Sequence, residues 1–395
     1  MRDVLPDLLR RWWAGEPVAL ATVVGAWSSA PRPPGTAMLV GPDGSAVGSV
    51  SGGCVEADVY ATGEQVLADS RAVLASYGIS DDEAFGVGLT CGGTLEVFVE
   101  RVDATSWPDL DLVAAEVEAD RPVAVATVLR HPDPAVVGRH LVLRPGSAPT
   151  VGTLGSPERN AAIAAHAREA LADGRSRRLV LAPDGSPGAG LEVFVASHLP
   201  RPRLLVFGST DVAAALARVG RLLGHRVTVC DVRPVFTTAA RFPDADEVVV
   251  AWPDAYLRAQ AEAGLVDERT VVCVVGHDPR VEVPLLEVAL RLPLAYVGAM
   301  GSRRSGELRE AALRAAGVTA AELRRLHAPI GLDLGARSAE ETAVSVLAEV
   351  IAAREGRTGR PLSTLSGPVH APVATPGPAS PAAAAPTGPP APARR

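Results

Sequence analysis

The chain has 395 residues, of which 47% are hydrophobic, and this length allows two or three domains with cores of their own. Its net charge of -7 argues against a nucleic-acid-binding protein. Four cysteines do not suggest a disulfide scaffold, and we recognise neither a signal peptide nor an apolar run of the roughly 18 residues that a membrane span requires. These features predict a cytoplasmic protein with reduced cysteines.

The first hundred residues alternate short apolar runs with turn signals, which predicts an α+β unit. We expect a helix over 3–14, strands over 18–24, 36–40, 46–50 and 95–99, and a helix from about residue 54 to residue 68. A Ser/Pro-rich loop is expected over 25–35. Trp12 and Trp13 are expected to pack against the first strand.

The same pattern of strands returns about a hundred residues later. Residues 16–23 match 120–128, residues 47–50 match 151–154, and residues 95–99 match 191–195. Because order and spacing both agree, the sequence predicts an internal duplication. The two copies would occupy 1–105 and 106–199.

Two cysteines in the first copy lie beside pairs of glycines. These residues are Gly52, Gly53 and Cys54 before a helix, and Cys91, Gly92 and Gly93 before a strand. Paired glycines allow a tight turn that brings backbone N–H groups close to a ligand, and a helix N-terminus favours the thiolate. The second copy keeps the strands but has Glu158 and Pro187 at these places. This difference favours a functional cysteine pair over the alternative of two small buried side chains.

Residues 200–355 alternate strands with helices, which predicts a Rossmann-like, doubly wound parallel sheet. We expect strands over 204–207, 226–231, 247–251, 270–275 and 294–297. Gly208 follows the first strand, and Asp231 ends the second, where a dinucleotide's ribose is usually held, with Arg233 in the same polar group at this edge. Thr210 replaces the middle glycine, which normally lets pyrophosphate approach the backbone. The pattern therefore favours the fold without bound NAD(P).

Other polar residues follow the later strands of this sheet. His277 and Asp278 follow the fourth strand, Gly301, Ser302, Arg303 and Arg304 follow the fifth, and His327 and Asp333 lie in a later glycine-containing loop. A Ser at a helix N-cap beside two arginines is suited to phosphate, although a solvated basic helix start is the alternative. Residues 356–395 are rich in Pro and Ala, and we expect them to be disordered.

Seven segments together resemble the XdhC/CoxI family, the accessory factors that mature molybdenum hydroxylases. They are residues 48–56, 88–93, 229–234, 241–246, 277–279, 296–304 and 327–337. The resemblance implies a protein that binds the molybdenum cofactor, molybdopterin, and protects it while a cysteine desulfurase installs its terminal sulfur. The protein would then deliver it to an apo molybdenum hydroxylase such as xanthine dehydrogenase or carbon monoxide dehydrogenase. The chain departs from the family pattern at Thr210 and Asp211.

The resemblance also suggests roles for the candidate residues. Cys54 and Cys91 would offer soft thiolate ligands to molybdenum, with the adjacent glycines Gly52, Gly53, Gly92 and Gly93 shaping the turns. Ser302, Arg303 and Arg304 would hold the pterin phosphate, and Gly208, Asp231, His277, Asp278, Gly301, His327 and Asp333 would complete the pocket. A chaperone of this kind needs no catalytic residue. The cysteines and arginines would converge in a cleft between two domains, or across a homodimer.

Two other hypotheses remain open. The C-terminal domain could belong to an NAD(P)-dependent oxidoreductase in which His277 acts as acid and base. The two cysteines could instead form a redox switch, provided that their Cα atoms lie within about 7 Å of each other.

Overall fold

The computed structural model describes residues 1–27, 32–78, 93–146 and 148–366, and it divides there into two compact units, Met1–Pro200 and Arg201–Ser366. Within these ranges no helix combines the length and the apolar character that crossing a membrane requires. Cys91 and Gly92 lie outside the described residues, as do residues 367–395 of the expected tail.

The described part of the first unit contains two antiparallel sheets with the same strand order, β3-β2-β1-β5-β4 and β8-β7-β6-β10-β9. The first sheet consists of β1 (Val18–Trp27), β2 (Ala37–Val40), β3 (Ala46–Gly48), β4 (Val73–Tyr77) and β5 (Thr94–Val102). The second consists of β6 (Val123–Arg130), β7 (His140–Leu143), β8 (Val151–Gly152), β9 (Arg177–Leu181) and β10 (Leu191–His198). The matching orders confirm the predicted internal duplication.

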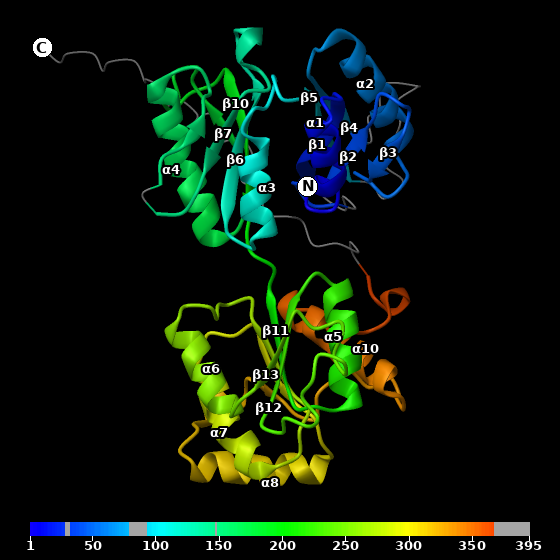
Figure 1. Cartoon of the computed structure of the whole chain (residues 1–395), viewed down its shortest axis with the longest axis vertical. Coiled ribbons are helices and arrows are strands. Elements are labelled where there is room, and N and C mark those ends of the chain that lie inside the picture. Colours follow the sequence, from blue (N-terminus) through cyan, green and yellow to red (C-terminus); the bar gives the residue numbers. More distant parts are fainter. Residues whose placement is uncertain (28–31, 79–92, 147, 367–395) are drawn as a thin grey trace, which may run out of the picture. The chain divides into compact units, whose positions relative to one another are not determined.

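Helices cover both faces of each sheet in this unit. They are α1 (Leu5–Trp13), α2 (Glu56–Asp69), α3 (Leu110–Glu118) and α4 (Pro157–Asp173). Apolar side chains of α1 and α3 pack in one core with the facing sides of the two sheets, whereas α2 and α4 cover the outer sides (Figure 1). Leu8 of α1 is fully buried there, and truncation of such a leucine to alanine costs about 2–5 kcal/mol of stability.

The structure differs from the sequence expectations at several elements of this unit. Strand β1 continues to Trp27, beyond the expected end at residue 24, because it pairs with β5 along its whole length through a bulge near Val23. Strands β4 and β9 and helix α3 were not expected. Trp12 packs against the core and its Nε1 donates to the carbonyl of Trp107 at 3.1 Å, but Trp13 is 67% exposed, so its expected packing is wrong.

The second unit is a six-stranded parallel sheet in the order β13-β12-β11-β14-β15-β16. Its strands are β11 (Arg203–Phe207), β12 (Arg226–Asp231), β13 (Glu247–Val250), β14 (Val271–Val274), β15 (Tyr296–Ala299) and β16 (Leu326–His327). Its helices are α5 (Asp211–Leu222), α6 (Pro253–Glu262), α7 (Pro279–Ala289), α8 (Arg303–Ala315), α9 (Ala320–Leu323) and α10 (Ala339–Arg354). Numbered along the chain the order reads 3-2-1-4-5-6, that of a Rossmann fold, as the sequence predicts.

The sheet of the second unit is buried between two layers of helices. Helices α5 and α10 pack on one face, and α6, α7 and α8 pack on the other (Figure 1). The sixth strand, β16, was not expected because it has only two residues. The described part of the expected tail contains a short exposed 3₁₀ helix at Leu362–Thr364.

Candidate functional site

A pocket of about 460 Å³ opens at the carboxyl edge of the parallel sheet, between the turns that follow β11 and β14. These two neighbouring strands continue into helices on opposite faces of the sheet, which makes this the topological switch point where Rossmann-like folds bind ligands. Gly208 and Gly276 both line it. A Cβ atom on Gly208 would lie 2.6 Å from the Gly276 nitrogen, and its φ of +122° also requires glycine.

Asp231 lies at the end of β12 and lines this pocket, as predicted, but its carboxylate already has partners. It accepts the Ser209 N–H at 2.7 Å, the Arg233 N–H at 3.0 Å, and the Arg233 guanidinium through Nε at 3.0 Å and Nη2 at 2.7 Å. Burial alone would raise the pKa of Asp231. These hydrogen bonds and the Arg233 charge lower it by more than burial raises it, so the net shift of the pKa is downward. The carboxylate that dinucleotide folds offer to ribose is therefore neutralised within the chain.

The turn between β11 and α5 shows what the departure at Thr210 does. Thr210 is the N-cap of α5, and its Oγ1 accepts the Ala213 N–H at 3.2 Å. A side-chain hydroxyl thus occupies part of the helix N-terminus that a pyrophosphate would otherwise approach. Asp211 points to solvent, with 93% of its side chain exposed, and its Oδ1 lies 3.5 Å from Arg241 Nη2.

The turn after β14 contributes His277 and Asp278 to the same pocket. Asp278 caps α7 by accepting the Arg280 N–H at 3.0 Å, and it pairs with the Arg280 guanidinium at 2.7 Å. The Arg280 hydrogen bond lowers the pKa of Asp278. The pocket therefore brings together four predicted residues, which are Gly208, Asp231, His277 and Asp278.

Sequence reasoning missed Gly276, Arg280 and Glu282, which line the pocket together with Arg233, a residue that the sequence places at this edge. Glu282 of α7 is buried and pairs with the buried Arg309 of α8 at 2.9 Å, and Arg309 also donates to the carbonyl of Met300. Within the described residues, Glu282 Oε1 and Arg309 Nη1 have no hydrogen-bond partner. A buried pair with two unfilled bonding positions can accept a polar group of a ligand or a water.

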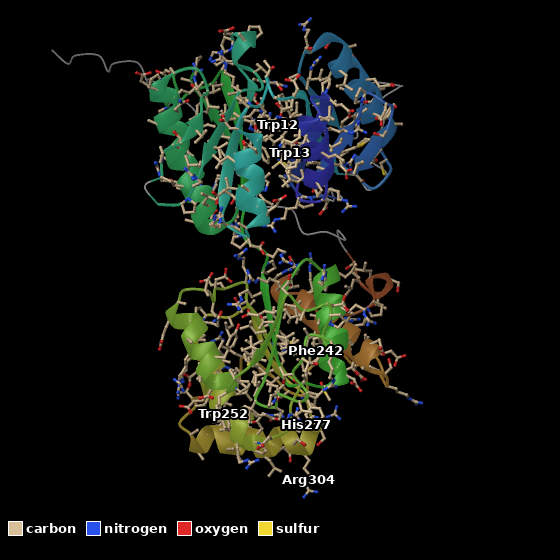
Figure 2. All side chains as sticks on the ribbon, in the orientation of Figure 1. Trp12, Trp13, Phe242, Trp252, His277 and Arg304 are labelled. Carbon is tan, nitrogen blue, oxygen red and sulfur yellow. The ribbon has the colours of Figure 1, made fainter. Side chains whose placement is uncertain are left out.

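The start of α8 does not contribute to the lining of this pocket. Ser302 caps the helix by accepting the Ser305 N–H at 3.1 Å, and Gly301 precedes it with a φ of +149°. Arg303 and Arg304 are exposed, and Figure 2 shows Arg304 pointing outward from α8. The predicted N-cap is confirmed, while the phosphate role of this group stays a prediction.

His327 and Asp333 also lie outside the lining of the pocket. His327 stacks on Tyr296 with ring centroids 4.3 Å apart, and its Nδ1 lies 3.0 Å from the Glu349 carboxylate. The same carboxylate accepts the Tyr296 hydroxyl at 2.5 Å and the Gly331 N–H at 2.7 Å. Asp333 is exposed in the following loop. The His327 side chain is thus engaged in a network that ties β15, β16 and α10 together.

In the first unit, the turn before α2 has the tight shape that the glycines predict. Gly52 and Gly53 have φ values of +89° and +123°, and a Cβ on either would meet no atom within 4 Å. The glycines are therefore required by backbone conformation and not by crowding. Cys54 is half-buried, and α2 begins two residues after it, at Glu56.

The backbone N–H groups of this turn were expected to face a ligand, and that expectation is wrong for Gly52 and Gly53. Their N–H groups donate to the Glu56 carboxylate at 2.9 and 2.7 Å, and the Ser51 N–H does so at 2.8 Å. The hydroxyls of Ser49 and Ser51 donate to it as well. Burial raises the pKa of Glu56, but these hydrogen bonds outweigh it and hold the pKa well below its usual range. The N-terminus of α2 carries a partial positive charge and N–H groups that are unpaired within the helix, and the Glu56 carboxylate is the anion that binds there.

The second copy repeats this construction without the cysteine. The Leu154 N–H donates to Asn160 Oδ1 at 2.8 Å, and Asn160 Nδ2 donates to Thr153 Oγ1 at 3.2 Å. Asn160 stands 104 residues after Glu56, and the exposed Glu158 stands 104 residues after Cys54. In both copies a polar side chain of the following helix accepts one or more backbone N–H groups of the turn, whereas only the first copy has a cysteine at this turn. Gly93 is buried just before β5.

The other two cysteines are inert by position. Cys230 in β12 and Cys273 in β14 are fully buried, and burial raises the pKa of each thiol to about 12. Neither can act as a thiolate at neutral pH.

Two protein-family models match separate parts of the chain. The family model described as the XdhC and CoxI family matches twice, over residues 12–78 and 116–182, and the XdhC Rossmann domain matches residues 204–350. The two matches of the first model are 104 residues apart and coincide with the two copies.

Several named proteins are similar over most of the chain. A Bacillus subtilis protein named as a probable xanthine dehydrogenase subunit is 27% identical over 86% of this chain and 94% of its own length. The Escherichia coli protein named molybdenum cofactor insertion chaperone PaoD is 26% identical over 89% of this chain and 88% of its own. A Bacillus halodurans crystal structure described as a xanthine dehydrogenase shares the fold, with a TM-score of 0.67, 24% identity, and coverage of 90% of this chain and 96% of that one. The matches to the two family models show that the chain belongs to the XdhC/CoxI family.

Proposed function

We propose that this chain is an accessory factor that binds the molybdenum cofactor as cargo and delivers it to an apo molybdenum hydroxylase of the xanthine dehydrogenase or carbon monoxide dehydrogenase type. Family membership and the relative named a molybdenum cofactor insertion chaperone support this proposal. The observation that carries it is the switch-point pocket, which offers space and polar groups for a small organic ligand. The task is binding, shielding and release, so we assign no catalytic residue.

We assign the pterin part of the cargo to the switch-point pocket. Gly276 leaves open space for the close approach of a ligand, while His277, Asp278 and the Asp231–Arg233 pair supply polar contacts. Ser302, Arg303 and Arg304 are a second proposed group for an anion, because they are exposed beside a capped helix start. His327 and Asp333 remain candidate contacts of the cargo, and mutation of each measures its effect on the amount of bound pterin.

Cys54 and Cys91 are the proposed thiolate ligands of the cargo's molybdenum. Thiolates suit a soft, thiophilic centre, and the space above Gly52 and Gly53 lets a ligand approach the Cys54 turn. Thiolates also require a reducing compartment, so we assign this activity to the cytoplasm. In the proposed cycle the cofactor stays bound while a cysteine desulfurase installs its sulfur. We also propose a homodimer, in which one protomer supplies the cysteines and the other supplies the pocket.

The proposal is tested by expressing the chain in cells that make molybdopterin and measuring the pterin that copurifies. Cys54→Ala combined with Cys91→Ala is expected to lower the retained molybdenum and the activation of a target hydroxylase several-fold. Glu158→Ala, which changes the position equivalent to Cys54 in the second copy, is the matched control and is expected to have no effect. Unchanged molybdenum content in the cysteine variant would refute the thiolate role.

An NAD(P)-dependent oxidoreductase is the competing proposal, and the strand order and the position of Asp231 favour it. Against it, Thr210 caps the helix at which the pyrophosphate would bind, and Arg233 already neutralises Asp231. Titration with NADH and NADPH separates the two proposals. Micromolar binding by the unmodified chain would reverse our ranking.

A further inference from the structure

Two arginines reach the switch-point pocket on turns of identical construction. In Asp231-Val-Arg233 and Asp278-Pro-Arg280, the aspartate accepts the backbone N–H of the arginine two residues later at 3.0 Å. It also accepts the guanidinium side-on, through Nε at 3.0 or 3.1 Å and Nη2 at 2.7 Å. Each arginine is therefore fixed by its own carboxylate in one orientation.

This pairing leaves each guanidinium able to bind an anion. A side-on pair uses Nε and one N–H of Nη2, so the planar fork directs its remaining N–H groups away from the carboxylate. Arg233 and Arg280 are 51% and 86% exposed as side chains, and both line the pocket. They occupy its rim, where a charged end of a ligand stays partly in solvent.

Contacts outside the Asp231 turn also hold Arg233 in place. Its guanidinium lies 5.2 Å from the centre of the Phe236 ring, and Arg241 approaches the same ring at 5.7 Å. Thr237 then ties this loop to the β11 turn, because its buried Oγ1 lies 2.7 Å from Ser209 Oγ and donates to the carbonyl of Arg233 at 2.8 Å. Such preorganisation lowers the entropic cost of binding.

We propose that Arg233 and Arg280 together bind a phosphate monoester group of the ligand, and that Arg233 makes the pocket prefer a phosphorylated ligand over one that ends in hydroxyl groups. The physical reason is the state of Asp231, whose two oxygens are occupied and cannot receive a ribose diol. This inference rests on the proposed function, since the molybdopterin phosphate would be the group bound. It assigns that phosphate to the pocket rim and not to Arg303 and Arg304.

The test measures equilibrium binding of two probes to the purified full chain. The probes are the fluorescent pterin obtained by oxidising molybdopterin, as its phosphomonoester and after a phosphatase has removed the phosphate. Arg233→Gln and Arg280→Gln are each expected to weaken binding of the phosphorylated probe about tenfold and to change binding of the dephosphorylated probe less than about twofold. Loss of the preference in Arg303→Gln with Arg304→Gln, and not in the pocket variants, would assign the phosphate to the start of α8 and contradict this inference.

Asp267-Glu-Arg269 provides a matched control. It has the same side-on geometry, with Arg269 N–H to Asp267 at 3.0 Å and Nη2 to Asp267 at 2.7 Å, but it precedes β14 and so lies at the opposite edge of the sheet. Arg269→Gln is expected to leave both probes unaffected. A similar loss of phosphate preference in this variant would mean that net charge alone accounts for the effect, which contradicts the proposal.

Removing Arg233 also exposes the charge of Asp231, so a second variant separates attraction from repulsion. Asp231→Asn with Arg233→Gln removes both charges and is expected to show the same loss of phosphate preference as Arg233→Gln. Recovery of the preference in the double variant would show that Arg233 only neutralises Asp231, and it would overturn the proposal. Circular dichroism of each variant verifies the fold.

The outcomes distinguish this inference from the proposed function. If the unmodified chain binds both pterins equally well, the arginine inference fails and the proposed function survives. If it binds neither pterin but binds NADPH at least tenfold more tightly than NADH, with Arg233→Gln abolishing the difference, the proposed function fails while the phosphate site stands.

Discussion

The carboxylate of Glu56 accepts the backbone N–H of Gly53 at 2.7 Å and so fills the turn that carries Cys54. The N–H groups of Ser51 and Gly52 and two serine hydroxyls converge on the same carboxylate. An acidic side chain of the first helical residue thus neutralises the partial positive charge at the start of α2. The Cys54 N–H donates to Ser51 Oγ at 3.0 Å, and this hydroxyl donates to Glu56, so the backbone of Cys54 is tied to the internal anion.

We therefore predict that Glu56→Gln lowers the free energy of unfolding by about 2 kcal/mol, because an amide has a single acceptor oxygen and cannot accept all the bonds that converge on the carboxylate. Urea denaturation measures this loss. The variant should also increase the rate at which Cys54 reacts with a thiol reagent, since the turn would loosen. Asn160→Ala in the second copy is the control for stability, and it should not alter the Cys54 rate. Equal labelling rates in both variants would contradict the link between Glu56 and Cys54.

The lowered pKa of Glu56 predicts an effect of pH on stability. An unfolded glutamate titrates near pH 4.3, and the folded carboxyl titrates well below that value. The unfolded state therefore binds a proton first as the pH falls, so the stabilisation is complete above about pH 5 and declines below it. Unfolding free energies between pH 7 and pH 3.5 should fall less steeply in Glu56→Gln than in the unmodified chain. Parallel slopes would show that Glu56 titrates normally.

The fold could be predicted because its signals are local and repeated. The matched segments at residues 16–23 and 120–128 indicate the duplication, and the strand ending in Asp231 indicates the Rossmann-like order. The short strands β4, β9 and β16 gave no comparable signal, since tertiary pairing and not their own pattern defines them.

The site was harder to predict than the fold. His277 and Asp278 could be found because polar residues after parallel strands gather at one edge. The His327–Glu349 contact joins residues 22 apart in sequence, so no local pattern shows it. Arg233 could be placed at this edge with Asp231, whereas Arg280 had only the Asp-x-Arg spacing as a signal, and that spacing becomes meaningful only once the pocket brings two of the turns together.

The two histidines of the second unit should respond differently to mutation. His277 lines the pocket, whereas His327 stacks on Tyr296 and contacts Glu349. We predict that His277→Ala lowers copurified pterin several-fold with less than about 0.5 kcal/mol change in stability. His327→Ala should destabilise the unit by about 1–2 kcal/mol and leave the pterin content of the folded protein unchanged. The reverse pattern would move the cargo from the β14 turn to the β16 loop.

The close approach of Gly208 to Gly276 gives a prediction with an internal control. Gly208→Ala introduces a Cβ 2.6 Å from the Gly276 nitrogen in addition to the strain of a φ of +122°. Gly224→Ala also imposes a positive φ, of +80°, but its Cβ would meet nothing within 4 Å. We expect Gly224→Ala to cost about 1 kcal/mol, the cost of backbone strain alone, and Gly208→Ala to cost about 3 kcal/mol or more.

Thermal unfolding compares the two glycine variants, and the pterin assay then shows whether the back of the pocket matters for cargo. Gly208→Ala should lose most of its pterin at a temperature where it is still folded, because separating the two turns reshapes the cavity that Gly208 lines. Gly224→Ala should retain its pterin. Equal stability losses in the two variants would mean that the turns after β11 and β14 can separate freely, and the pocket could then not hold a ligand in one fixed orientation.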